Sequence, residues 1–147
     1  MKQKETQFIK WFESISIGDI PLVGGKNASL GEMYQRLTPQ GIQIPPGFAV
    51  TADAFSVLIA QNGLSEKIYS LLSKLDPQDT KELAKRGLEI RALVRSVGIP
   101  EAVAHEIRQA YSELCRRTGL DEIDVAVRSS ATAEDLPEAS FAGQQET

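Results

Sequence analysis

Apolar residues recur along the chain with helical and strand-like periods, and these periods predict its secondary structure. Aliphatic side chains at three- and four-residue intervals predict helices over residues 25–37, 51–62, 64–75, 79–97 and 100–119. Shorter apolar runs predict strands within residues 8–20 and at 48–50 and 123–127. A helix-rich chain with a few short strands is typical of the α+β class.

Residues that favour helix ends support these boundaries. Asp79 and Glu82 have the spacing of a capping box, and Pro100 suits the first turn of a helix. Gly119 permits the left-handed backbone that often ends a helix. The aliphatic stripes predict helix-on-helix packing, which forms a core and implies no ligand.

The first polar cluster is Gly24-Gly25-Lys26, at the start of a predicted helix. Glycine permits close backbone approach, a helix N-terminus carries partial positive charge, and lysine adds a full charge, so the cluster could bind a phosphate. It is not a Walker A loop, because Ile20 and Asn27 stand where that motif needs glycine and a hydroxyl residue. A glycine turn beside a solvated lysine is the structural alternative.

The second polar cluster follows the predicted strand 123–127 and consists of Arg128, Ser129, Ser130 and Thr132. The planar fork of arginine suits phosphate oxygens, and ligands often bind at strand ends in α/β folds. In the alternative interpretation, Arg128 pairs with the acidic residues 134–135 and the hydroxyl groups cap a turn.

A third cluster, residues 139–147, places small residues around Phe141. Gly143 allows a mobile backbone there, which could close over a ligand and exclude water. A plain hairpin tip is the alternative.

Composition narrows the function classes. The 147 residues are 41% hydrophobic and 24% charged with a net charge of −4, which is typical of a globular protein and argues against nucleic-acid binding. No apolar run is long enough to cross a bilayer and no signal peptide is recognisable, so no membrane partner and a cytoplasmic location are expected. Residues 121–147 hold seven acidic residues and a single basic one, Arg128.

Neither His105 nor Cys115 has the partners of a catalytic or metal-binding residue. They are the only histidine and the only cysteine, and no carboxylate cluster with metal spacing lies near them in the sequence. We therefore predict no metal ligand and no catalytic residue in this chain.

Three blocks of sequence, residues 23–33, 44–55 and 127–147, resemble the beginning of the phosphoenolpyruvate synthase (pyruvate, water dikinase) family. Related folds occur in pyruvate phosphate dikinase and rifampicin phosphotransferase. The resemblance implies the N-terminal subdomain of an ATP-grasp fold across residues 1–147. It also implies that Lys26, Arg128, Gly143 and Thr147 line an ATP site, with Lys26 and Arg128 holding one polyphosphate from two sides.

The resemblance also implies that the chain is a fragment, inactive alone. The complete enzyme would convert ATP, pyruvate and water to phosphoenolpyruvate, AMP and phosphate through a phosphohistidine, with that histidine, the Mg²⁺ ligands and the pyruvate-binding barrel elsewhere. His105 matches none of these groups. A rifampicin phosphotransferase and a non-catalytic nucleotide- or partner-binding module are the alternatives, and a homo-oligomeric full-length enzyme stays open.

Overall fold

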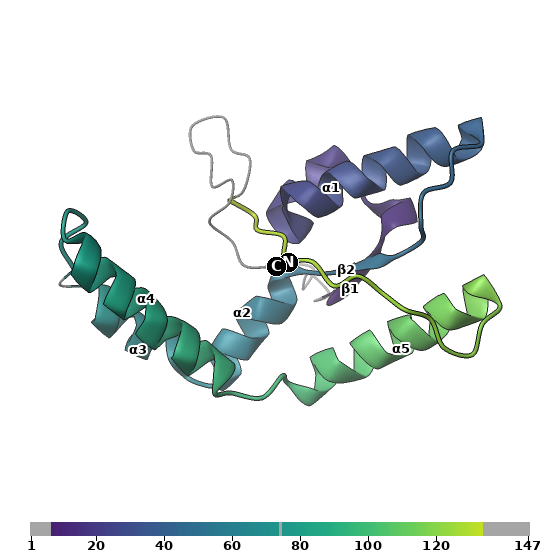
Figure 1. Ribbon diagram of the computed structural model, residues 1–147. Helices are drawn as coiled ribbons and strands as arrows, with labels where there is room; N and C mark the ends of the chain where they lie inside the picture. The colour runs from purple at the N-terminus through teal and green to yellow at the C-terminus, as the bar shows by residue number, and fades with distance from the viewer. Residues whose placement is uncertain (1–6, 74, 134–147) are drawn as a thin grey trace, which may run out of the picture. The chain divides into compact units, whose positions relative to one another are not determined.

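The computed structural model describes residues 7–73 and 75–133 (Figure 1). The chain divides into two compact units. The first unit combines residues 1–54 with 105–147, and the second comprises residues 55–104. Most described residues lie in α-helices, and the first unit also contains a two-stranded sheet, which confirms the α+β class.

The sheet of the first unit pairs β1 (Ile9–Trp11) with β2 (Phe48–Val50) in antiparallel register. Trp11 lies opposite Phe48, and the two rings meet edge to face with centroids 5.5 Å apart. Cross-strand aromatic pairs of this kind stabilise short ladders. The strand predicted at 48–50 is confirmed. The strand predicted within 8–20 is limited to three residues, after which come two 3₁₀ turns, Phe12–Ser14 and Ile17–Asp19.

Asp19 organises the second of these turns. Its carboxylate accepts hydrogen bonds from Lys10 Nζ at 2.5 Å and from the backbone amide of Ser16 at 2.8 Å. The bond from Lys10 and the bonds from Ser16 hold the pKa of Asp19 below its usual value. The turn Ile17–Asp19 is therefore tied to β1 through Lys10.

Helix α1 (Ile20–Leu37) packs over this sheet and is interrupted at Gly24, where φ is 79° and ψ is 163°. Gly31, in the same helix, lies directly against Ile15, whose side chain is completely buried. The core of the unit consists of Ile15, Val23, Ala28 and Ala49. The helix predicted over residues 25–37 is confirmed beyond the interruption. After α1 comes a 3₁₀ turn at Thr38–Gln40.

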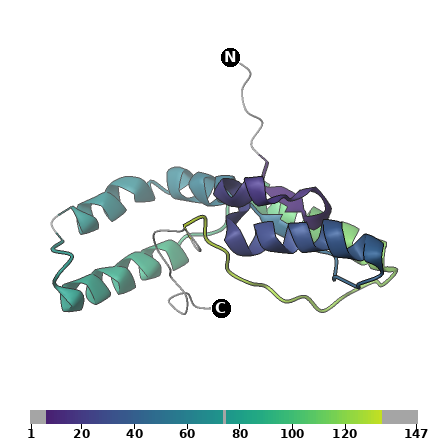
Figure 2. The same ribbon diagram turned by 90° about the horizontal axis from the view of Figure 1, so that it is seen from above.

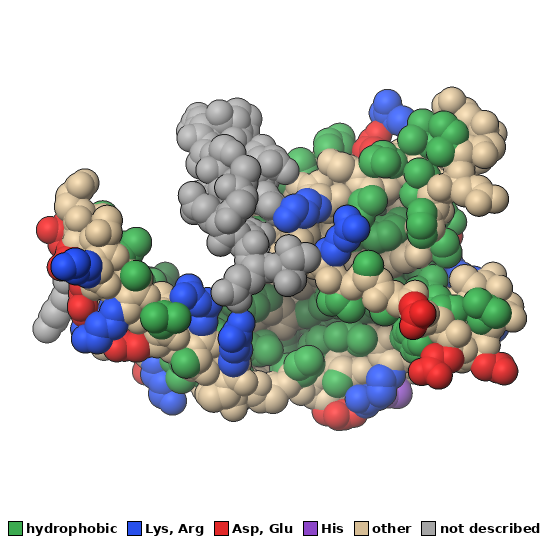
Figure 3. Space-filling view, in the orientation of Figure 1, with side chains coloured by type: hydrophobic (Ala, Val, Ile, Leu, Met, Phe, Trp, Pro, Cys, Tyr) green, Lys and Arg blue, Asp and Glu red, His purple; other side chains and the backbone are tan. Residues whose placement is uncertain are grey.

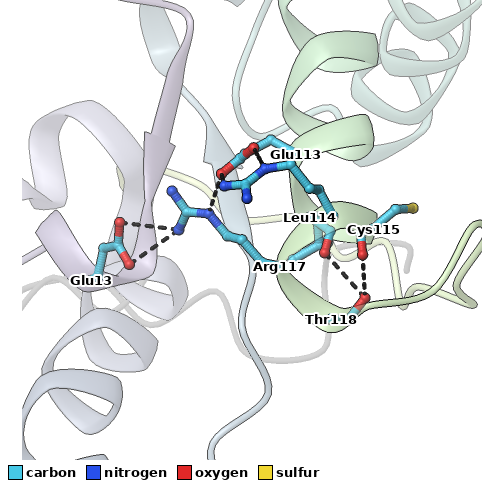
Figure 4. A network of polar contacts seen from close by, with 7 residues as sticks. Glu13, Glu113, Leu114, Cys115, Arg117 and Thr118 are labelled. Atoms are coloured by element: carbon cyan, nitrogen blue, oxygen red, sulfur yellow. Dashed lines mark hydrogen bonds and ion pairs between the residues drawn. The ribbon is translucent and has the colours of Figure 1, made fainter.

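Helix α5 (Glu101–Thr118) contacts strand β1 and the turn that follows it through the side chain of Arg117. The Arg117 guanidinium lies over the Trp11 ring, 4.0 Å from its centroid, and donates to both carboxylate oxygens of Glu13 at 3.1 Å. The same guanidinium donates to Glu113 at 2.8 Å (Figure 4). A cation held by a ring and two carboxylates links residues that are 104 positions apart in the sequence.

Glu113 gives this network a dependence on pH. Hydrogen bonds from Arg116 and then from Arg117 lower its pKa from 4.5 to about 2. A carboxylate with a lowered pKa stabilises the folded state above its unfolded pKa and loses that contribution as the pH falls through its folded pKa. We expect the free energy of unfolding to decrease between pH 4.5 and about 2, and to decrease less in Glu113→Gln.

Chemical denaturation across this pH range measures the difference between the two proteins. Because the ion pairs of Glu113 with Arg116 and Arg117 are exposed to solvent, the change in the free energy of unfolding should be small and should shrink further in 1 M salt. An NMR titration of the Glu113 carboxyl group is the direct check, and a midpoint near 4.5 would contradict the prediction.

The second unit contains α2 from residue 55 onward (Ala52–Gln61 in full), α3 (Leu64–Leu72) and α4 (Thr80–Arg95). Helices α3 and α4 lie side by side (Figures 1 and 2). The Asp79 carboxylate accepts a hydrogen bond from the backbone amide of Glu82 at 3.0 Å, so Asp79 is the N-cap and this half of the predicted capping box is confirmed. The Glu82 side chain pairs with Arg86 at 2.8 Å.

The strand predicted at 123–127 is wrong for the described part of the chain. Residues 123–130 have no regular secondary structure, and Val125 and Val127 are 49% and 86% exposed. A strand requires a partner for its ladder, and the one ladder among the described residues joins β1 to β2. The alternation of apolar residues at 123–127 indicated that a strand could form there, but it did not identify a second strand with which this segment could pair. No helix of the described chain is long and apolar enough to span a membrane.

Candidate functional site

The interruption of α1 at Gly24 is where two distant segments of the first unit meet. Val23, Gly24 and Gly25 are all buried. A Cβ atom on Gly24 would overlap the Ser130 hydroxyl and lie 2.8 Å from the carbonyl oxygen of Ala131. Glycine is required here both for its positive φ and because the 130–131 segment packs against its backbone.

One carbonyl oxygen organises this contact. Val23 O accepts a hydrogen bond from Ser130 Oγ at 3.0 Å and another from Asn27 Nδ2 at 2.9 Å. Ser130 and Val23 are 107 positions apart in the sequence. The segment after α5 is thereby docked on the residues that begin the main part of α1, and Figures 1 and 2 both show it running to that end of the helix.

The contact brings together the segments that carry Lys26 and Arg128. Lys26 lies in the first turn after the interruption, and Arg128 lies two residues before Ser130. Both side chains are exposed. Figure 3 shows basic side chains close together over the N-terminal end of α1. Amide groups in a first helical turn lack intrahelical acceptors, so this end of the helix adds partial positive charge.

Tyr111, on α5, holds the other end of the Arg128 segment, and the sequence analysis missed it. Its hydroxyl donates to the carbonyl of Ile123 at 2.9 Å and accepts the amide of the same residue at 3.2 Å. The bond with Ile123 favours the phenolate, but burial and the neighbouring Cys115 and Glu122 outweigh it and raise the pKa of Tyr111. The phenol therefore stays protonated and able to donate. No periodicity in the sequence signals such a side-chain-to-backbone contact.

Of the other residues singled out in the sequence, some lie within the described part of the chain and some do not. Gly143 and Thr147 lie outside the described residues, as does the third polar cluster. His105 is exposed on α5. Across residues 7–73 and 75–133, no three His, Cys, Asp or Glu side chains are arranged to hold a metal ion.

Comparison with known proteins identifies relatives along nearly the whole chain. Residues 20–147 match the family model described as pyruvate phosphate dikinase, AMP/ATP-binding domain. A phosphoenolpyruvate synthase of Neisseria meningitidis is 52% identical over 140 residues, which are 95% of this chain and 18% of that protein. The phosphoenolpyruvate synthases of Synechocystis and Pyrococcus furiosus are 50% and 46% identical, over 98% and 96% of this chain and 18% and 21% of their own lengths. The chain thus spans about a fifth of these relatives, and the resemblance of its sequence blocks is confirmed.

Proposed function

Because this chain belongs to the family of pyruvate phosphate dikinase AMP/ATP-binding domains, we propose that it binds the phosphates of ATP as part of an ATP-grasp site. We further propose that the protein to which it belongs is a phosphoenolpyruvate synthase. That enzyme would convert ATP, pyruvate and water to phosphoenolpyruvate, AMP and phosphate, with the phosphohistidine outside residues 1–147.

The observation that carries the proposal is the docking of Ser130 on Val23. It joins a lysine at a helix start to an arginine on a distant segment, and both cations belong to the same compact unit. Two exposed cations on segments that meet near the first turn of a helix suit a polyanion such as a triphosphate. The relatives named above favour the synthase over a rifampicin phosphotransferase.

The chemistry of such a site is positioning and charge neutralisation. Phosphoryl transfer leaves little covalent work for the protein, so groups that hold the phosphates in line and offset their charge account for much of the catalysis. Lys26 would act as a flexible point charge and Arg128 as a planar fork for two oxygens. We propose that any Mg²⁺ bound with ATP takes its protein ligands from outside residues 1–147, since no three His, Cys, Asp or Glu side chains are grouped within residues 7–73 and 75–133.

Titration of the protein with ATP and with AMP tests the proposal. A hydrogen bond to a charged group contributes about 1.5–3 kcal/mol, so Lys26→Ala and Arg128→Ala should each weaken ATP binding by roughly tenfold to a hundredfold. AMP offers a single phosphate and should lose less affinity in either variant. Isothermal titration calorimetry measures both ligands.

Arg36→Ala is the matched control. Arg36 is a highly exposed cation at the opposite end of α1, paired with Glu32 at 2.7 Å. It tests whether loss of any positive charge on this helix weakens binding, and we expect unchanged ATP affinity. Equal effects of Arg36→Ala and Lys26→Ala would refute the placement of ATP at the start of the helix.

A further inference from the structure

Side-chain-to-backbone hydrogen bonds hold the segment that carries Arg128 near both of its ends. Tyr111 holds Ile123 through both its backbone groups, and Ser130 donates to the carbonyl of Val23. Residues 124–129 between these points are exposed and have no regular secondary structure. The position of Arg128 therefore depends on how the segment is held, and the Ser130 hydrogen bond lies only two residues from it.

The Ser130 anchor is attached to the same structure that presents Lys26. Its acceptor, Val23 O, also receives the side-chain amide of Asn27, the residue after Lys26. Gly24 makes room for the anchor, because any side chain there would overlap the Ser130 hydroxyl. The carbonyl oxygen of Val23 thus holds both the segment with Arg128, through Ser130, and the helix turn with Lys26, through Asn27.

We infer that Ser130 is a positioning residue for polyphosphate binding: its hydrogen bond to Val23 places Arg128 so that Arg128 and Lys26 act on one ligand. The inference rests on the proposed function and adds a residue to it. Ser130 contacts the protein backbone and acts through Arg128.

The physical basis is preorganisation. Two cations on a fixed frame bind a polyphosphate as a chelate, because the second contact forms within the complex already made by the first. A segment that must be ordered during binding contributes less, since part of the interaction offsets the lost conformational freedom. Removal of the Ser130 hydroxyl should therefore reduce what Arg128 contributes and leave the contribution of Lys26 intact.

Ser130→Ala should weaken the binding of ATP and of inorganic tripolyphosphate by on the order of tenfold. AMP, with one phosphate, should change by less than about threefold. Ser130→Cys keeps the size of the side chain but donates only weakly, so it should behave as Ser130→Ala does. Ser112→Ala removes an exposed hydroxyl from α5 in the same unit, away from the Arg128 segment, and should bind as the wild type does.

A double-mutant cycle by calorimetry on the full chain distinguishes positioning from a general structural role. Arg128→Ala should cost much less ATP affinity in the Ser130→Ala background than in the wild type, whereas Lys26→Ala should cost the same in both. Circular dichroism confirms that each variant is folded.

Independent effects of Ser130→Ala and Arg128→Ala on tripolyphosphate binding would overturn the inference while leaving the proposed function standing. If the wild-type protein bound neither ATP nor tripolyphosphate, both the inference and the proposed function would be overturned. Wild-type affinity in Ser130→Cys would show that shape and not hydrogen bonding positions the segment, which also contradicts the inference.

Discussion

Replacement of Gly31 by alanine should destabilise the first unit by up to about 2 kcal/mol, although alanine is the better helix former. A Cβ atom at this position would overlap the carbonyl oxygen of Ile15 and lie 2.6 Å from its Cβ atom. Ile15 is completely buried in the core of this unit, so it can move away only by disturbing that packing. Overpacking of this kind costs about 3 kcal/mol at the upper end of its usual range, against a gain of about 1 kcal/mol in helix propensity.

Urea denaturation followed by the fluorescence of Trp11, the single tryptophan, reports on this unit. Gly18→Ala is the control, because the nearest atom to its new Cβ would be Ser16 Oγ at 3.6 Å, an ordinary contact. We expect the control to lie within about 0.5 kcal/mol of the wild type. A Gly31→Ala protein as stable as the wild type would show that the helix can move away from Ile15.

Gly24→Ala should weaken ATP binding by about a hundredfold, more than loss of the Ser130 hydroxyl alone. The backbone at Gly24, with φ of 79° and ψ of 163°, occupies a region that is essentially restricted to glycine and costs other residues about 1–3 kcal/mol. The new methyl group would also overlap the Ser130 hydroxyl and crowd the carbonyl of Ala131. Both effects displace the Arg128 segment from the start of the helix.

Calorimetry with ATP measures the loss, and Gly41→Ala separates strain from site geometry. Gly41 has φ of 83° in the same unit, but no atom lies within 4 Å of the position of its Cβ. Its replacement should lower the free energy of unfolding by about 1–2 kcal/mol and leave ATP affinity unchanged. A similar loss of ATP affinity in both variants would mean that reduced stability, and not the docking at Gly24, weakens binding.

The local signals in the sequence were reliable where a single element carries its own information. The aliphatic stripes located the helices, and Asp79 begins α4 as its spacing with Glu82 predicted. The double glycine marked the start of the main part of α1, because a positive φ at Gly24 is a local property that glycine alone tolerates well. The candidate residues Lys26 and Arg128 were likewise recognised from their motifs, and their role in ATP binding stays a prediction.

Contacts between distant segments could not be predicted in this way. The strand expected at 123–127 failed because alternation of apolar residues does not supply a partner. The hydrogen bond from Tyr111 to Ile123 has no counterpart in the periodicity of the sequence. The same is true of the contacts of Arg117 with Trp11 and Glu13.

The sequence by itself determined the main part of each helix, the glycine turn that precedes residues 25–37, the acidic composition and the family to which the chain belongs; that α1 begins at Ile20 and is interrupted at Gly24 came from the structure. Only the tertiary structure decided that Ser130 docks on Val23, and hence that the Arg128 segment meets the helix start next to Lys26. The physical reason is that backbone dihedral preferences and apolar periodicity act over a few neighbouring residues. A hydrogen bond across 107 positions forms only when the packing of the whole unit has brought its donor and acceptor together.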